Sequence, residues 1–232
     1  FYKADPQKIV VIPHGYNPLP NVIPSKARNL THNSIELSII GEIPRRGTRP
    51  EALRRAPRND FGPYFLFIGR IERKKNLLTL IHAFELFSKT HPDFKLVLAG
   101  KPGVGGDEII KAAKDNPRIV LTGYVDEPTK IALLKNAFAF VLPSFYEGFG
   151  FPILEAMQFN LPIIASDIPA SREVARDSAL YFKSTDSEAL VALMKQLQNP
   201  ELKTDLTKSY SNHLAQYSWE RCAQVTWEAL IK

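Results

Sequence analysis

Short, continuously apolar runs alternate with longer stretches of helical periodicity from about Pro63 to the end of the chain, and this alternation limits the fold more than any other feature. Such runs are typical of strands buried on both faces, because a strand with one wet face would alternate apolar and polar residues. The predicted strands span residues 64–68, 95–99, 119–122, 138–142, 162–166 and 179–182.

Helical stretches separate these strands. Asn76 is predicted to cap the first helix, whose apolar stripe begins at Leu77 and repeats at helical spacing. The other predicted helices span residues 107–114, 128–137, 152–159 and 186–198, with further ones following Pro169, Pro200 and Ser218. Strands alternating with helices predict a doubly wound parallel sheet, a Rossmann-like α/β fold. Because ligands bind such sheets beyond the carboxyl ends of the strands, the loops after residues 68, 99, 122 and 142 should face one crevice.

The chain divides into three parts by composition. Residues 1–17 are expected to be the end of a preceding domain or a hinge. Residues 18–60 are expected to be a basic, Pro-rich insertion or linker, because they show no sustained period, and residues 61–232 the folded domain. The net charge of +6 comes mainly from the middle part: residues 26–58 hold eight Lys and Arg against three Glu, whereas the chain from Asp60 onward holds 20 charges of each sign.

This charge distribution argues against a nucleic-acid-binding protein, since the folded part is neutral and carries no recognition motif. The sequence has no continuous apolar run of about 18 residues, so no transmembrane segment is expected. Cys222 is the only cysteine, which fits a reducing compartment, and a cytoplasmic location is expected.

Residues suited to bind a phosphorylated ligand follow the predicted strands. They are Gly69, Arg70 and Lys75 after the first strand, Lys101 after the second, Tyr124 and Val125 after the third, and Glu147, Gly148, Phe149, Gly150 and Glu155 after the fourth. Arginine and lysine suit a diphosphate, and glycines before a helix let phosphate approach unpaired backbone N–H groups. Carboxylates can accept hydrogen bonds from the hydroxyls of a sugar or ribose. Each feature also has a structural interpretation: a glycine turn, a solvated charge run or, for Glu155, stabilisation by the helix dipole.

The run PSFYEGFGFPILE at residues 143–155 resembles the E-x7-E signature of glycosyltransferase family 4, a group of retaining enzymes with the GT-B fold. Gly69-Arg70 and Lys75-Asn76 match the FxGRxxxxKN block of that family, and the resemblance covers roughly residues 60–232. The sequence departs from the family pattern at Asn160, where Gly is common, at His14, where Asn is commoner, and in the long basic segment 18–60.

This resemblance implies the C-terminal, donor-binding half of a GT-B enzyme that transfers a sugar from a nucleoside diphosphate sugar with retention. Arg70 and Lys75 would hold the diphosphate, together with Gly69 and the backbone of residues 148–150, and Glu147 would contact the donor sugar. Arg70, Lys75 and Glu147 would thus be the catalytic residues. Glu155 would bind the ribose, Tyr124 and Val125 would line the base pocket, and Lys101 would lie nearby. No metal and no cofactor would be needed.

The acceptor, the base and the sugar are not determined by the sequence. A separate N-terminal half would supply the acceptor site, so the isolated chain is expected to bind donor without transferring sugar, and the resemblance allows peripheral attachment to a membrane through that half. Two alternatives stay open at this point. One is another GT-B enzyme, such as a nucleotide-sugar epimerase; the other is a non-catalytic remnant that binds a nucleotide sugar or a partner.

Overall fold

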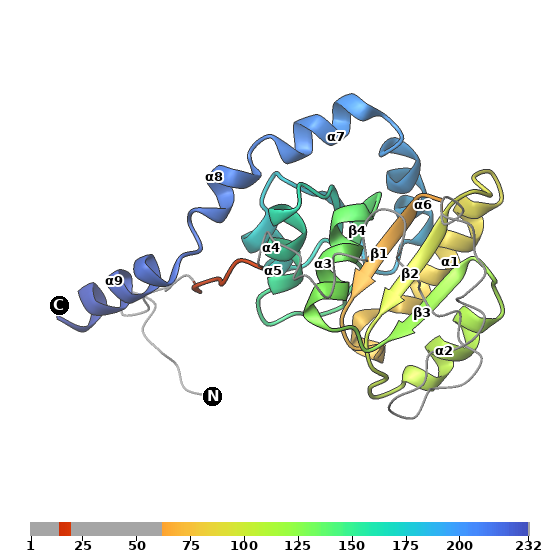
Figure 1. The fold of residues 1–232 in the computed structure, drawn as a ribbon, viewed down its shortest axis with the longest axis horizontal. Helices are drawn as coiled ribbons and strands as arrows, with labels where there is room; N and C mark the ends of the chain where they lie inside the picture. Colours follow the sequence, from red (N-terminus) through yellow and green to blue (C-terminus); the bar gives the residue numbers. More distant parts are fainter. Residues whose placement is uncertain (1–13, 20–61, 232) are drawn as a thin grey trace.

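Six parallel strands form one sheet at the centre of the computed structural model, which describes residues 14–19 and 62–231 (Figure 1). The strands are β1 (Tyr64–Ile68), β2 (Lys95–Ala99), β3 (Ile119–Gly123), β4 (Ala139–Leu142), β5 (Ile163–Ser166) and β6 (Leu180–Phe182). Their order in the sheet is β3-β2-β1-β4-β5-β6, and every neighbouring pair is parallel. The doubly wound, Rossmann-like sheet predicted from the sequence is confirmed, and its strand order reverses between β1 and β4.

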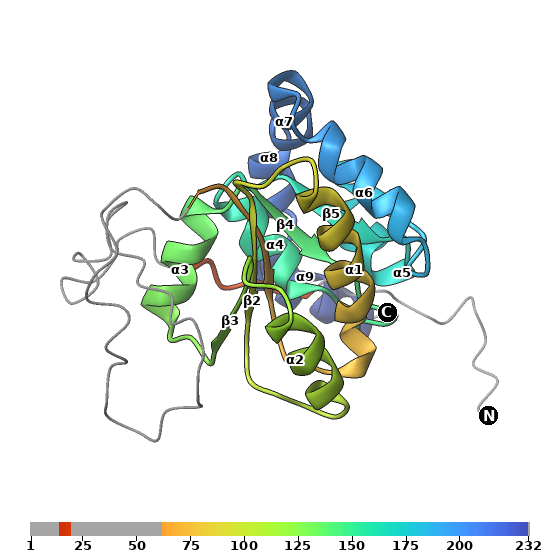
Figure 2. The same cartoon turned by 90° about the vertical axis from the view of Figure 1, so that its right-hand side faces the viewer.

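Helices cover both faces of this sheet. They are α1 (Leu77–Ser88), α2 (Gly106–Lys114), α3 (Glu127–Asn136), α4 (Phe151–Gln158), α5 (Pro169–Ala175), α6 (Ser187–Gln196), α7 (Pro200–Thr207), α8 (Tyr210–Leu214) and α9 (Trp219–Leu230), with a 3-10 turn, η4, at Arg73–Lys75. Figure 2 shows α1, α2 and α6 on one side of the sheet and α3 on the other. None of these helices is long and apolar enough to cross a membrane.

The core lies between the sheet and its helices. Phe65 on β1 is fully buried and packs edge-on against Phe87 of α1, with ring centroids 5.3 Å apart, and against Phe138, 5.6 Å away. Full burial of one such side chain contributes about 1.5–3 kcal/mol to folding. Burial of the apolar strands therefore stabilises the sheet, and the sheet in turn determines where the carboxyl ends of the strands lie.

Several elements differ from expectation in detail. Asn76 occupies the N-cap position of α1, but its side chain does not cap the helix. The backbone of Asn76 adopts the left-handed conformation, and its side-chain NH₂ group donates hydrogen bonds to the carbonyls of Pro143 and Ser184. The prediction that Asn76 caps this helix was wrong, because its side-chain oxygen accepts from the Thr79 hydroxyl over 2.7 Å and not from a backbone N–H, while its NH₂ group donates to the two distant carbonyls. The helix α8 and the turn η4 were not predicted, as both are too short to show a period.

The short segment 14–19 packs against the C-terminal part of the domain. Tyr16 and Leu19 are buried, and both hydrogen-bond to the side-chain amide of Gln158, which α4 supplies. The backbone N–H of Tyr16 donates to the carbonyl of Tyr217 over 3.0 Å. Apart from Pro18 and Leu19, the predicted linker 18–60 lies outside the described residues.

Candidate active site

Glycines end the first three strands and leave the carboxyl edge of the sheet as bare backbone. Gly69, Gly100 and Gly123 follow or end β1, β2 and β3, and the N–H of Gly100 donates to the carbonyl of Gly123 over 2.8 Å. Gly100 has a φ of +155°, and a Cβ added to it would lie 1.7 Å from the carbonyl oxygen of Gly69. Only glycine allows this close approach, so the floor of the site is formed by main chain and is open to a ligand.

A pocket of about 490 Å³, the main pocket, opens over this floor. Its walls are formed by Ile68, Gly69, Arg70, Ala99, Gly100, Lys101, Tyr124, Val125, Glu127 and Lys130. Five residues predicted from separate loops, Gly69, Arg70, Lys101, Tyr124 and Val125, therefore line one cavity. The ammonium of Lys101 lies 4.5 Å from the ring centroid of Tyr124, within the range of a cation–π contact.

Lys75 and Glu147 form the second part of the site. The Lys75 ammonium donates to both carboxylate oxygens of Glu147, over 2.7 Å and 2.8 Å, and the Ser144 hydroxyl donates to Oε1 over 2.6 Å. Both side chains are mostly buried, at 14% and 11% exposure. A charge pair shielded from water keeps more of its strength than an exposed one, so the two side chains hold each other in place.

The loops that carry these residues are joined where the strand order reverses. The N–H of Phe145, after β4, donates to the carbonyl of Lys74, after β1, over 2.9 Å. Asn76 donates to the Pro143 carbonyl over 2.9 Å. These bonds connect the β1–α1 and β4–α4 loops across the position where doubly wound sheets bind their ligands.

The glycine loop 148–150 leads into α4 without a side-chain cap. Pro152 has no N–H and the N–H of Ile153 donates to the Gly150 carbonyl over 2.9 Å, so the N–H groups that could meet a phosphate are those of Phe151 and of the glycine loop. Gly150, with a φ of +113°, forms the N-cap, and Gly148 is exposed. Between them, Phe149 packs against the rings of His14 and Tyr217, at centroid distances of 4.9 Å and 5.8 Å. The segment 14–19 thus contacts the loop predicted to bind phosphate.

Glu155 is held by a residue that the sequence did not reveal. Lys130 of α3 donates to Glu155 Oε1 over 2.8 Å, and the two side chains are 22% and 17% exposed. Burial first, and then the negative charge of Glu155, raise the pKa of the nearby Tyr16 phenol. Since Lys130 also lines the main pocket, Glu155 is linked to that pocket through the lysine.

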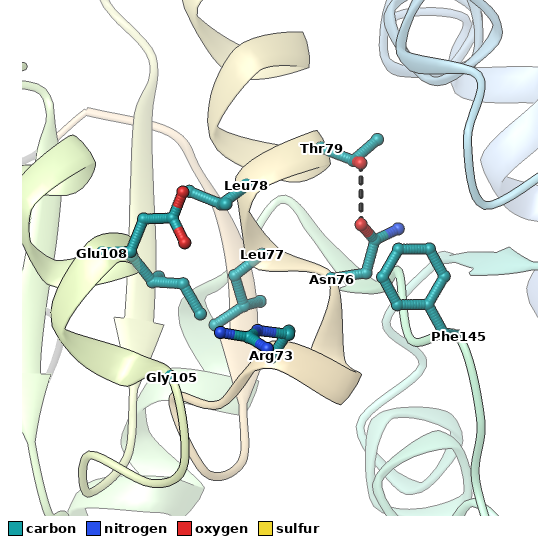
Figure 3. Close-up of a pocket in the computed structure, with 9 residues that line it drawn as sticks. Arg73, Asn76, Leu77, Leu78, Thr79, Gly105, Glu108 and Phe145 are labelled. Atoms are coloured by element: carbon teal, nitrogen blue, oxygen red, sulfur yellow. Dashed lines mark hydrogen bonds between the residues drawn. The ribbon is translucent and has the colours of Figure 1, made fainter.

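Arg73 belongs to the same basic run as Arg70 and Lys75 but takes part in a different cavity. A smaller pocket, of about 270 Å³, lies between η4 and the first turns of α1 and α2. Figure 3 shows the Arg73 guanidinium in this pocket, close to Gly105 and below Leu77. Within residues 14–19 and 62–231, no group of three or more His, Cys, Asp or Glu side chains could hold a metal ion.

Two relatives with curated names resemble the chain over the folded part. It is 34% identical over 171 residues to the O-antigen chain mannosyltransferase B of Escherichia coli, a match that covers 72% of this chain and 45% of the relative. It is 38% identical over 173 residues to a glycogen synthase of Mycobacterium tuberculosis, covering 72% of this chain and 42% of the relative. The chain therefore spans less than half the length of these two relatives.

Solved structures support the same fold. A TarM variant from S. aureus, crystallised with fondaparinux, α-GlcNAc-glycerol and UDP, superposes with a TM-score of 0.65 at 22% identity, over 76% of this chain and 37% of the TarM chain. This likeness shows that the chain shares the Rossmann-like fold of the matched part of TarM. Residues 48–213 match the family described as glycosyl transferases group 1, and the chain belongs to that family.

Proposed function

We propose that this chain binds a nucleoside diphosphate sugar at the carboxyl edge of its sheet and is the donor-binding domain of a retaining glycosyltransferase. One observation carries the proposal: the pocket lined by Arg70 and Lys101 opens over bare strand ends at the edge of the sheet that also carries the Lys75–Glu147 pair. Cations and carboxylates are thereby presented around main chain that a ligand can approach closely.

The pocket suits the nucleoside end of the donor. Tyr124 and Val125 offer apolar and aromatic surface to a base, and Lys101 lies beside the Tyr124 ring. Glu155, anchored by Lys130, would accept hydrogen bonds from the ribose hydroxyls through the oxygen that the lysine does not hold. The base and ribose would thus be bound by the loops after β3 and by α3 and α4.

The second part of the site suits the diphosphate and the sugar. Arg70 can bind phosphate as a fork and Lys75 as a point charge, with the backbone of residues 148–150 completing the site. Negative charge grows on the leaving diphosphate as the glycosidic bond breaks. Fixed donors placed there lower the barrier, by about 3–4 kcal/mol for a single strong donor in other enzymes. Glu147 would contact the hydroxyls of the sugar, and these cations would make a metal ion unnecessary.

The acceptor would bind outside this domain, and transfer would take place in a cleft that a second domain helps to form. Holding donor and acceptor together in the correct geometry can supply about 7–11 kcal/mol of the barrier. We therefore propose that the domain described here supplies donor binding and leaving-group stabilisation. Retention at the anomeric carbon is part of the same proposal and rests on the match of residues 143–155 to the E-x7-E pattern.

A thermal-shift panel tests the donor-binding role. The full chain is heated with UDP-, GDP- and ADP-sugars, including mannosyl donors, because the O-antigen relative is named as a mannosyltransferase. A ligand at 100 times its dissociation constant adds about 2.7 kcal/mol of stability, and this should raise the melting temperature clearly. Lys75→Ala should abolish most of the shift. If no nucleotide sugar stabilises the chain at millimolar concentration, the proposal is wrong.

A further inference from the structure

The main pocket is lined by one acidic and one basic residue of α3, and neither of them has a role in base binding in the proposal above. Resting on the proposed donor-binding function, we propose that Glu127 and Lys130 select guanine, so that the nucleotide bound is a guanosine diphosphate. Both residues lie in the first turn of α3, three positions apart, and both line the pocket with Tyr124 and Val125. Positions i and i+3 of a helix lie on the same face, so the two charged groups are presented together.

The Glu127 carboxylate is available to a ligand. Among residues 14–19 and 62–231, no side chain or backbone group forms an ion pair or hydrogen bond with it. It is not needed to cap α3 either, because the Asp126 side chain accepts from the N–H of Thr129 over 3.0 Å. An acidic residue in the first turn gains some stability from the helix dipole, but that effect does not require it to line a cavity.

Lys130 is fixed in position and keeps donors to spare. Its hydrogen bond to Glu155 uses one of the three N–H groups of the ammonium. Only 22% of its side chain is exposed, and the lysine lines the pocket. It can therefore hold the residue proposed to bind ribose and still donate to a base that lies next to that ribose.

Guanine is the common base whose edge matches this pair. Its N1–H and N2–H₂ groups lie next to each other and can both donate to one carboxylate, while O6 and N7 accept from a lysine. Uracil offers a single N–H between two carbonyl oxygens, which the carboxylate would repel. Adenine and cytosine would turn a ring-nitrogen lone pair towards Glu127. A site built to receive particular hydrogen-bond donors rejects ligands that lack them strongly, because its own polar groups are left unpaired.

Calorimetric titration of the full chain with GDP, UDP and ADP tests this assignment, since the three ligands differ only in the base. GDP is expected to bind at least about tenfold more tightly than UDP or ADP. Glu127→Gln keeps the shape of the side chain but replaces one acceptor oxygen by a donor. It should weaken GDP binding by about tenfold or more and leave UDP and ADP within about twofold of their original affinities.

Glu188→Gln is the matched control, because Glu188 also lies in the first turn of a helix, α6, but outside the pocket. It should change none of the three affinities. UDP or ADP binding as tightly as GDP, or Glu127→Gln weakening all three equally, would overturn the guanine assignment and leave donor binding intact. Failure of all three diphosphates to bind would overturn the proposed function itself, and the guanine assignment with it.

Discussion

The ammonium of Lys75 lies 2.7 Å and 2.8 Å from the two carboxylate oxygens of Glu147, so two residues proposed to act on adjacent parts of the donor also bind each other. An ammonium has three N–H groups, and the pair can therefore persist while the third reaches a phosphate oxygen. Ser144 adds a further donor to Glu147. This arrangement ties the position of the phosphate-binding cation to that of the carboxylate proposed to bind the sugar.

The two glutamates should have separable effects on binding. Glu155→Ala should weaken a free nucleoside diphosphate and the nucleotide sugar alike, by about tenfold or more, because both contain the ribose. Glu147→Ala should weaken mainly the nucleotide sugar. It should leave the free diphosphate unchanged or bound more tightly, since it releases Lys75 towards the phosphate. Calorimetry with both ligands measures the difference, with Glu201→Ala on α7 as an exposed control. Equal losses for both variants on both ligands would contradict these roles.

Arg70 and Lys75 should bind phosphate without a metal ion. Alanine at either position should lower the affinity for a nucleoside diphosphate by about tenfold or more and that for the nucleoside little, because the removed groups are charge-assisted donors to phosphate. Arg73→Ala is a matched control from the same turn, as Arg73 lines the smaller pocket instead. The titrations are repeated with a chelator, which should leave donor binding unchanged. A strict requirement for added divalent cation would show that these cations do not suffice.

The strands could be predicted almost to the residue because glycine or proline bounds several of the apolar runs. Tyr64–Ile68 lies between Pro63 and Gly69, and Lys95–Ala99 ends at Gly100. The rule that parallel strands present their carboxyl ends at one edge then placed Arg70, Lys101 and Tyr124 together, although they lie in three different loops. A local pattern combined with one geometric rule was sufficient for this part of the site.

What the sequence did not reveal depends on contacts between distant residues. Lys130 lies within the predicted helix 128–137 and had no predicted role, and only the packed domain places its ammonium 2.8 Å from Glu155, 25 positions away. Tyr16 lies in the segment expected to be the end of a preceding domain or a hinge, and its hydrogen bond to Gln158, 142 positions away, could not be read from the sequence. No periodicity encodes such pairs. The only local sign for Lys130 was its spacing from Glu127, directly after the loop expected to line the base pocket.

A side chain at Gly100 should destabilise the folded domain. Gly100→Ala would place a Cβ 1.7 Å from the Gly69 carbonyl oxygen at a φ of +155°, so the ends of β1 and β2 must move apart. Backbone strain and overpacking of this kind cost about 2–4 kcal/mol together. Thermal unfolding should show a melting temperature lower by several degrees. Gly148→Ala is the control for stability, because a Cβ there meets no atom within 4 Å. Equal melting temperatures for the two variants would show that the strand ends adapt easily.

Burial of His213 should make the domain less stable in mild acid. His213 lies on α8 with Nε2 bonded to the Val174 carbonyl, and burial lowers its pKa, an effect that the charge of Arg176 reinforces and the Val174 bond opposes. The folded state therefore takes up a proton on this ring less readily than the unfolded chain, in which histidine titrates near its ordinary pKa of about 6.5. The unfolded state consequently binds more protons as the pH falls through that range. The free energy of unfolding should therefore fall as pH drops from about 7.5 to about 5.5. His213→Gln should reduce this dependence, measured by thermal unfolding at both pH values, whereas His82→Gln, at an exposed site on α1, should retain it. An unchanged pH dependence in His213→Gln would place the titrating group elsewhere.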